Sequence, residues 1–385
     1  MFDALVFGHD AHALAESAEF ALGLRELTRR VAPLRWWFSL AGKPLPGPSD
    51  FHPCSAAEYF LVILNPAILV SDGLVEELQQ VLESGNAVTC ALPSDQRGFA
   101  EGVSLDYATR PGFDRFVRRL GQTQPRLPYD GRAPWAYLVA RSALEDLPAD
   151  SPPSWETLPA YLKDGSVIAQ RAYVHSYGDY YLNTRSEMLD LIPAEVESLL
   201  DVGGGEGGFA QVFIAQRGRR AVVAEQNPRA ALAARGKGIE VREGSFDSCS
   251  ALAEFDCVSF LDVLEHIADP LAALQQARAA LRPGGWLLLS VPNVGHWAVV
   301  WDLLGGLFEY QPVGILCNTH LRFYSRYGLR TLLEDCGFRV ERWDDVESPI
   351  PTTFQRFLDD RPAPGVAIDA ASLATSSFNV LARRD

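Results

Sequence analysis

The sequence has little of what marks nucleic-acid-binding or membrane proteins. Its 385 residues carry 34 Lys and Arg against 49 Asp and Glu, and the net charge of −15 disfavours nucleic acid and anionic membranes as partners. The most apolar run, residues 60–70, is broken by Asn65 and Pro66 and is too short to cross a bilayer. The N-terminus has acids early and lacks the basic start of a secretory signal, so we expect a cytoplasmic protein.

Cysteine is also scarce, and its spacing offers no metal site. None of the six cysteines forms a CxxC pair, and no two stand at zinc-ligand spacing with histidine. His9 and His12 lie three residues apart, but no third ligand accompanies them. We therefore expect reduced thiols and no bound metal. The cysteines are Cys54, Cys90, Cys249, Cys257, Cys317 and Cys336.

What is present is a globular composition in a chain too long for one core. Apolar residues make up 48% and charged residues 22%, and 385 residues predict two domains. The first half alternates apolar strand patterns with amphipathic helix patterns, which favours an α/β layer. A stretch rich in Pro, Ser and Asp follows Leu147 and indicates a boundary. We expect an α/β domain at 1–150, a linker at 151–174 and a second domain at 175–385. The expected strands of the first half are 4–8, 35–42, 59–66, 87–92 and 135–140, and the expected helices are 18–31, 74–85, 113–121 and 141–148.

The second half is organised around LLDVGGGEGGF at 199–209, which predicts a strand, a tight glycine loop and a helix. Such a loop lets backbone N–H groups approach a ligand at a helix N-terminus. Gly203, Gly205 and Gly208 fit GxGxxG, and Glu225 ends the next strand pattern twenty residues after Gly205, where an acid can hold a ribose. This much suits NAD and S-adenosylmethionine equally.

The later chain distinguishes the two cofactors. The strings FDCVSFLDVLEHIADP, LRPGGWLLLSVPN and THLRFYSRYGLRTLLEDCGF follow the glycine loop in order. With that loop, they make residues 175–385 resemble a class I S-adenosylmethionine-dependent methyltransferase of the bacterial small-molecule type. The resemblance implies a seven-stranded Rossmann-like sheet whose last strand, 376–384, is antiparallel. It also implies methyl transfer to an O or N atom of a small molecule, with a sugar or polysaccharide precursor as one acceptor class.

The resemblance carries cofactor contacts over to particular residues. The glycines would lie against the methionine and ribose, Asp201 would orient the loop or the amino group, and Glu225 would hold the ribose. Ser245 stands where the family often has an acid near the adenine amine, and Asp247 is a substitute for it. The implied cofactor-binding residues are Asp201, Gly203, Gly205, Gly207, Glu225, Gln226, Ser245, Phe246 and Leu261, together with Tyr181 and Arg185 from the preceding aromatic and basic segment.

The acceptor side is predicted at residues 296–325, an apolar and aromatic insertion that we interpret as a lid. It ends in a Thr-His-Leu-Arg-Phe motif in which His320 is the first candidate for a general base, because histidine transfers protons near neutral pH. The alternative is a histidine that fixes the lid to the core. Asp262 and Tyr324 complete the candidate catalytic residues. His266 is interpreted as structural, and His296 remains a candidate pocket group.

The first half has a weaker resemblance, to inverting nucleotide-sugar glycosyltransferases. It is carried by the strings at 58–82 and 134–148. The family's metal-binding acids are missing, because Asn65, Pro66 and Ala67 stand in their place and Asp72 comes later. The resemblance therefore implies an inactive relic or a binding domain. Three alternatives remain for the whole chain: a bifunctional glycosyl and methyl transferase, a cofactor-binding protein without catalysis, and an NAD-dependent oxidoreductase. The sequence does not determine the oligomeric state.

Overall fold

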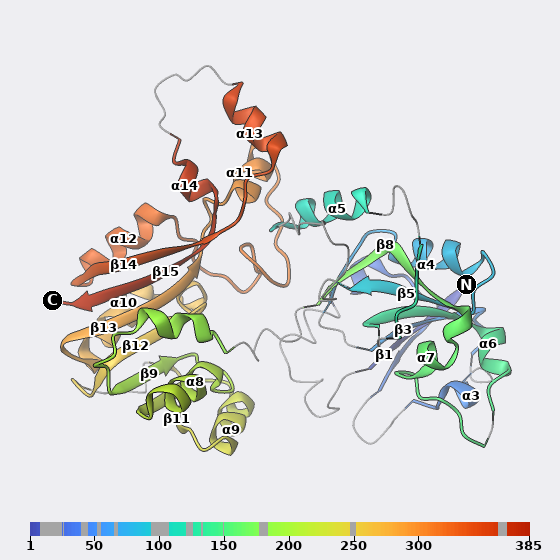
Figure 1. Ribbon diagram of the computed structural model, residues 1–385, viewed down its shortest axis with the longest axis horizontal. Coiled ribbons are helices and arrows are strands. Elements are labelled where there is room, and N and C mark those ends of the chain that lie inside the picture. The colour runs from blue at the N-terminus through green and yellow to red at the C-terminus, as the bar shows by residue number, and fades with distance from the viewer. Residues whose placement is uncertain are drawn as a thin grey trace. The chain divides into compact units, whose positions relative to one another are not determined.

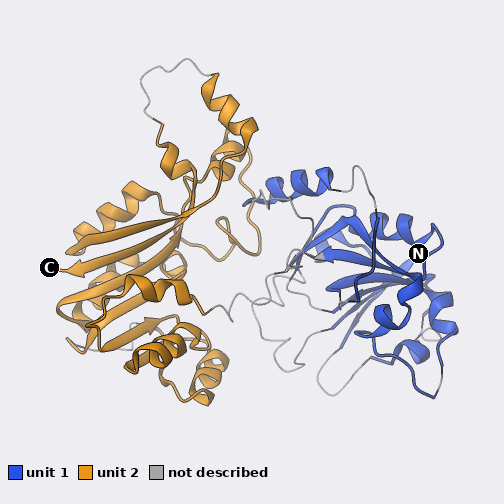
Figure 2. Ribbon diagram, viewed as in Figure 1, with its two compact units in different colours: residues 1–178 blue, residues 179–385 orange. Residues whose placement is uncertain are grey.

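The chain folds into two compact units, Met1–Gly178 and Asp179–Asp385 (Figure 2). None of the helices described is both long and apolar enough for a membrane span. The computed structural model describes residues 1–7, 25, 27–39, 45–51, 55–64, 68–93, 108–120, 126–131, 134–148, 150–176, 184–246, 252–360 and 368–385.

The first unit is built on a mixed eight-stranded sheet (Figure 1). Its order is β2-β1-β3-β7-β5-β8-β4, with β6 also paired to β8. β7 runs antiparallel to both of its neighbours, whereas β1, β2 and β3 are mutually parallel. The strands are β1 (Phe2–Val6), β2 (Trp36–Phe38), β3 (Tyr59–Ile63), β4 (Ile68–Val70), β5 (Val88–Pro93), β6 (Arg126–Pro128), β7 (Ala136–Ala140) and β8 (Ser166–Ser176).

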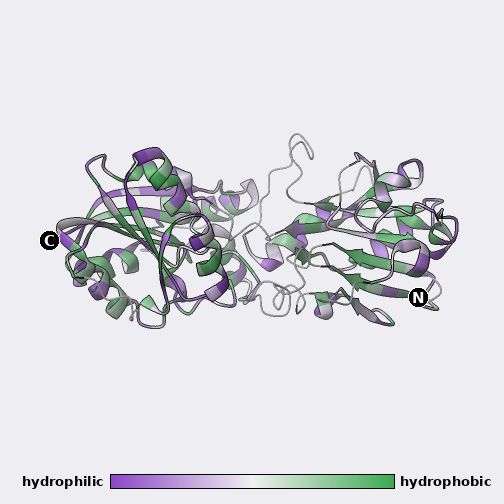
Figure 3. Cartoon of the chain, turned by 90° about the horizontal axis from the view of Figure 1, so that it is seen from below, coloured by the Kyte–Doolittle hydropathy of each residue, from purple (hydrophilic) through white to green (hydrophobic). Residues whose placement is uncertain are grey.

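Both faces of this sheet are buried. Along β1, Ala4 and Val6 belong to one apolar cluster and Leu5 to another, as the two-residue side-chain period of a strand requires. The central strands β3 and β7 consequently consist of apolar and aromatic residues throughout, and Figure 3 shows hydrophobic segments along the strands. The helices are α3 (Pro48–Phe51), α4 (Leu74–Leu82), α5 (Arg110–Arg119), α6 (Arg141–Glu145), α7 (Leu158–Tyr161) and the 3-10 turn η2 (Lys163–Gly165).

The linker expected at 151–174 is wrong. Residues 166–176 form β8, which pairs with β5 on one side and β4 on the other inside the first sheet. The start of this stretch is rich in Pro and Ser and therefore has the composition of a linker. It nevertheless leads into α7 and a buried strand. The expected helix at 18–31 lies largely outside the described residues.

The second unit contains a seven-stranded sheet of order β11-β10-β9-β12-β13-β15-β14. β9 to β13 are mutually parallel, and β15 inserts antiparallel between β13 and β14, as predicted. The strands are β9 (Ser198–Val202), β10 (Arg220–Glu225), β11 (Glu240–Glu243), β12 (Phe255–Leu261), β13 (Leu281–Pro292), β14 (Phe338–Glu347) and β15 (Thr375–Arg384).

Helices pack on both faces of this sheet. Along β9, Leu200 and Val202 join one core cluster and Leu199 joins the other. Side-chain caps start several helices; for example, Asp269 accepts a hydrogen bond from the Ala272 N–H at the start of α10. The helices are η4 (Ser186–Leu191), α8 (Gly208–Arg217), α9 (Pro228–Gly236), η6 (Leu264–His266), α10 (Pro270–Ala280), α11 (Trp297–Leu304), α12 (Arg326–Asp335), α13 (Thr352–Asp359) and α14 (Ala370–Leu373).

Helix α10 ends shortly before Pro283. Its last residue is Ala280, and Leu281 already pairs with Phe255 in the sheet. A residue that precedes proline avoids helical backbone angles, so Arg282 cannot easily continue the helix.

Leu274 and Leu271 on α10 offer a matched test of this packing. Leu274 is fully buried, whereas Leu271 is 43% exposed. We expect Leu274→Ala to lower the free energy of unfolding by about 2–5 kcal/mol, because it leaves a cavity in the core. Leu271→Ala should cost less than about 1 kcal/mol. Urea denaturation of both variants measures the difference, and equal losses would contradict the assigned orientation of α10.

Candidate functional site

The glycine loop adopts a backbone that only glycine accommodates easily. Gly203, Gly205 and Gly207 have φ angles of 66°, 55° and 78°. Space is also limiting, because a Cβ on Gly203 would lie 2.7 Å from Cγ2 of Val263, and one on Gly207 would lie 2.4 Å from Cδ1 of Ile239. The loop runs from the end of β9 to the start of α8, so its N–H groups gather at a helix N-terminus.

Glu225 ends β10 beside this loop. Its Oε2 accepts a hydrogen bond from the Gly205 N–H at 2.9 Å, and its Oε1 accepts one from the Asn227 N–H at 2.7 Å. A carboxylate offers about four acceptor positions, so two remain for a ligand. Gln226, the next residue, is exposed.

Asp201, in β9, packs against the glycine loop. Its side chain is buried, and its Oδ1 accepts a hydrogen bond from the Ser259 hydroxyl at 2.7 Å. Its Oδ2 lies so close to the loop that a Cβ on Gly204 would be 2.6 Å away. Burial raises the pKa of Asp201 to about 7, the nearby Glu225 adds to the rise, and Ser259 and Arg185 oppose it. Of the two roles the sequence suggests, this position favours orienting the loop.

Arg185, Asp262 and Ser290 meet where β12 and β13 end. The Arg185 guanidinium pairs with Oδ2 of Asp262, and its Nη2 donates to the Ser290 hydroxyl at 2.9 Å. That hydroxyl donates in turn to Oδ1 of Asp262 at 2.8 Å. Arg185 and Asp262 both have positive φ, at 46° and 56°, and such backbone strain is concentrated at functional sites. Leu261, half-buried, is the last residue of β12.

The expected adenine side is only partly visible. Phe246 packs edge-to-face on Phe260 with ring centroids 5.5 Å apart, and its carbonyl accepts a hydrogen bond from the Gln276 side chain. Ser245 is exposed. Tyr181 and Asp247 lie outside the described residues, so their predicted roles stay predictions.

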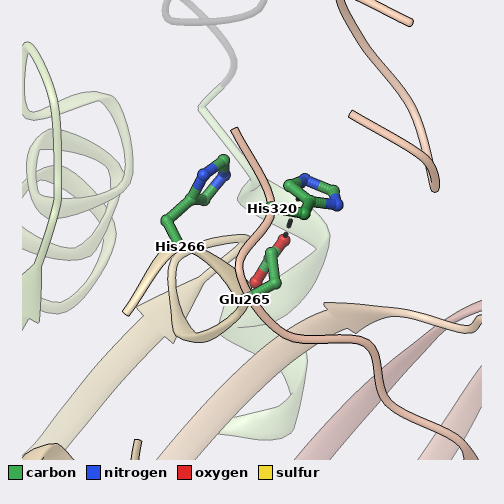
Figure 4. A group of neighbouring side chains, drawn as sticks. All are labelled: Glu265, His266 and His320. Atoms are coloured by element: carbon green, nitrogen blue, oxygen red, sulfur yellow. Dashed lines mark ion pairs between the residues drawn. The ribbon is translucent and has the colours of Figure 1, made fainter. Parts of the chain in front are cut away.

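His320 joins a cluster that the sequence analysis did not foresee. Glu265, His266 and His320 each offer a ligand atom, and these three atoms lie within 4.8 Å of one another. Nε2 of His320 is 4.0 Å from Oε1 of Glu265, and Figure 4 shows the carboxylate pointing toward His320. Two members of the cluster, Glu265 and His266, are adjacent in the sequence. His320 comes 54 residues after His266, so only the fold brings it to the other two.

The segment 296–325 is hydrogen-bonded to η6, the 3-10 turn that follows β12. The carbonyl of Glu265 accepts hydrogen bonds from the Leu321 and Arg322 N–H groups at 2.8 and 3.0 Å, which places His320 over Glu265. Beyond α11 the segment exposes Leu307, Phe308 and Tyr310. Phe308 lies edge-to-face on Tyr310 and on Phe323, at centroid distances of 5.5 and 5.8 Å.

Two other predicted site residues, Tyr324 and His296, are buried and make contacts that stabilise the fold. Tyr324, put forward as catalytic, is buried in the core cluster, and its hydroxyl donates to the Leu264 carbonyl at 3.4 Å. Burial also raises the pKa of Tyr324, so it remains a neutral phenol. His296 is fully buried, its Nδ1 accepts from the Ala298 N–H at the start of α11, and its Nε2 faces the Ser348 hydroxyl at 2.9 Å. We therefore assign both residues to packing and capping.

The pKa of Asp201 predicts a pH dependence of stability. Because the folded state holds this proton to a higher pH than the unfolded state, its contribution to stability is full below about pH 4 and is lost as pH rises toward 7. Asp201→Asn cannot titrate. We expect the free energy of unfolding of the wild type, relative to the variant, to fall by up to about 1.4 kcal/mol per pH unit over this range. Urea denaturation between pH 4.5 and 8 measures it, and parallel curves for the two proteins would rule it out.

Comparison with known proteins gives this geometry a family. A family model described as a methyltransferase domain matches residues 173–342. A ubiquinone biosynthesis O-methyltransferase of Parvibaculum lavamentivorans is 32% identical over 163 residues, which are 40% of this chain and 63% of that protein. One of Cereibacter sphaeroides is 37% identical over 182 residues, 44% of this chain and 71% of that protein.

A third relative has a different named substrate. The tRNA 5-carboxymethoxyuridine methyltransferase of Escherichia coli is 35% identical over 127 residues, which are 30% of this chain and 48% of that protein. The chain thus spans less than two thirds of the length of the Parvibaculum lavamentivorans and Escherichia coli relatives. It spans more than two thirds of the Cereibacter sphaeroides relative. Together with the seven-stranded sheet and its glycine loop, these matches show that the chain belongs to the class I S-adenosylmethionine-dependent methyltransferases.

Proposed function

We propose that the second unit moves a methyl group from S-adenosylmethionine to an oxygen atom of a small-molecule acceptor. The observation that carries the proposal is the buried Glu225 carboxylate held against the positive-φ glycine loop, with acceptor positions left over. The choice of oxygen is supported by the two relatives that are named O-methyltransferases.

The described residues fit the cofactor. Val263 and Ile239 leave no room for side chains at Gly203 and Gly207, and glycine backbone without a Cβ can come close to a ligand. The two unused acceptor positions of Glu225 suit the two ribose hydroxyls. When bound, the cofactor supplies an activated methyl group on a positively charged sulfur.

The reaction requires an oxygen that has lost, or is losing, its proton. The acceptor oxygen forms the new bond to carbon, and the carbon–sulfur bond breaks with its electron pair going to sulfur. The protein must hold the reactants in line and receive the proton. We place this step beside Asp262 and His320, because both lie near the carboxyl end of β12, close to the glycine loop after the neighbouring strand β9. Asp262 is fixed by Arg185 and Ser290, which favours a positioning role for it.

The aromatic rings of segment 296–325, of which Phe308 and Tyr310 are exposed, support an acceptor with an apolar face. Phe308, Tyr310 and Phe323 pack against one another, and Phe323 also lies 6.3 Å from the His320 ring, centroid to centroid. An aromatic alcohol and a sugar each present such a face. The proposed lid role of this segment rests on the same rings and on the attachment of Leu321 and Arg322 to Glu265.

Two alternatives differ from this proposal, one in the acceptor and the other in the activity of the first unit. A tRNA acceptor is named for the Escherichia coli relative, while the net charge of −15 disfavours it here. A bifunctional glycosyl and methyl transferase would need an active first unit, and we propose instead that this unit is a binding domain or a relic. Its decisive stretch, Asn65 to Ala67, lies outside the described residues.

The cofactor part of the proposal predicts the effect of Glu225→Gln. Losing the charge should weaken binding of S-adenosylhomocysteine at least about tenfold, since a charge-assisted hydrogen bond contributes about 1.5–3 kcal/mol. Glu240→Gln is the matched control, because Glu240 pairs with Arg220 at the opposite end of the parallel neighbour β11. Isothermal titration calorimetry measures both, and wild-type protein that binds no S-adenosylhomocysteine would refute the proposal.

The acceptor part is tested by methyl transfer itself. The full chain is incubated with S-adenosylmethionine labelled in its methyl group and, separately, with a hydroxylated aromatic compound, a nucleotide sugar and bulk tRNA. We expect label in one of the two small-molecule arms and none in tRNA. Label confined to tRNA would contradict the proposed acceptor class without affecting the cofactor assignment.

A further inference from the structure

The carboxylate of Glu265 is buried in the second unit. Its side chain is 1% exposed, and its Oε2 has no hydrogen-bond partner among the described residues. An unpaired carboxylate in the interior costs several kcal/mol unless a proton or a cation compensates it. Evidence for what compensates it comes from the two histidines beside it.

Both histidines are held in the form that ligates metals. Nδ1 of His266 is 3.2 Å from the Thr319 carbonyl oxygen, and Nδ1 of His320 is 3.0 Å from the Ile315 carbonyl oxygen. A carbonyl only accepts, so each Nδ1 carries the hydrogen and each neutral ring presents its Nε2 lone pair. Metal-binding histidines are typically fixed by a hydrogen bond of this kind from the other ring nitrogen.

From this geometry we infer that Glu265, His266 and His320 bind a divalent transition-metal ion. Two imidazole nitrogens and one carboxylate form a ligand set that suits zinc and its neighbours, with coordination positions left for a substrate oxygen. Ligand atoms within 4.8 Å need only modest side-chain rotation to reach the separation of about 3.3 Å expected around a tetrahedral zinc ion. The partly exposed ring of His266 leaves the cluster accessible.

The inference deepens the proposed function, on which its catalytic consequence rests. A hydroxyl bound to the ion ionises more easily, because the positive charge stabilises the oxygen anion. The proton then leaves to solvent, and His320 acts as a ligand in place of a general base. The acceptor class becomes a small molecule whose hydroxyl can reach this ion beside Asp262. The Arg185 pair would keep Asp262 from competing for the ion.

Metal binding is measured directly on the full chain, free of any affinity tag. After dialysis against a chelator, the protein is titrated with Co²⁺, which reports its ligands by visible absorption, and with Zn²⁺ by calorimetry. We expect one ion per chain. Glu265→Gln and His266→Gln should each weaken binding at least about tenfold. His175→Gln, in β8 of the first unit, is the control and should bind as the wild type does.

S-Adenosylhomocysteine binding and far-ultraviolet circular dichroism keep the test decisive. Because Glu265→Gln preserves side-chain size and Glu225 is untouched, this variant should remain folded and bind S-adenosylhomocysteine normally. The inference is overturned if folded wild type binds neither ion, or if folded variants bind it as tightly as the wild type. Wild-type protein that binds no S-adenosylhomocysteine would instead refute the proposed function, and the metal-binding measurement would still be valid.

Discussion

The second unit depends on the contact between the Glu225 carboxylate and the glycine loop. Three glycines with positive φ form a turn that has no side chains at these positions to hold it in place. The hydrogen bond from the Gly205 N–H to Glu225, with Asp201 packed beneath Gly204, fixes that turn to strands β9 and β10. A loop held in this way loses little conformational entropy when a ligand binds.

Parallel strands explain why the chemistry gathers in one place. β9, β10, β12 and β13 run in the same direction, so the residues that follow them meet at one edge of the sheet. Asp262 and Glu265 come after β12, Ser290 lies near the end of β13, and the segment after β13 returns His320 to Glu265. Charged groups there are desolvated, which accounts for the raised pKa of Asp201 and Glu265 and the lowered pKa of His320.

Much of the fold was readable from the sequence, because its cues are local. Apolar periodicity and glycine spacing predicted the strand, loop and helix at 199–209 and the placement of Glu225 beside the loop, whereas the seven-stranded sheet and its antiparallel last strand were implied by the family resemblance. The error at the linker arose where local composition and tertiary pairing disagree, because residues 151–174 look like a linker until β8 is seen between β5 and β4. The catalytic role predicted for Tyr324 stays a prediction, and the structure places its ring in the core cluster.

By itself, the sequence determined the position of the cofactor loop, since a glycine turn and the acid that faces it need only correct spacing, and the later motifs indicated the class of the second unit through their resemblance to a family. The tertiary structure alone decided which titratable groups meet. Glu265 and His266 are neighbours in the chain, but His320 reaches them through backbone hydrogen bonds from Leu321 and Arg322 to Glu265. Contacts between distant segments depend on how the chain returns to the sheet edge, and no local pattern records that path.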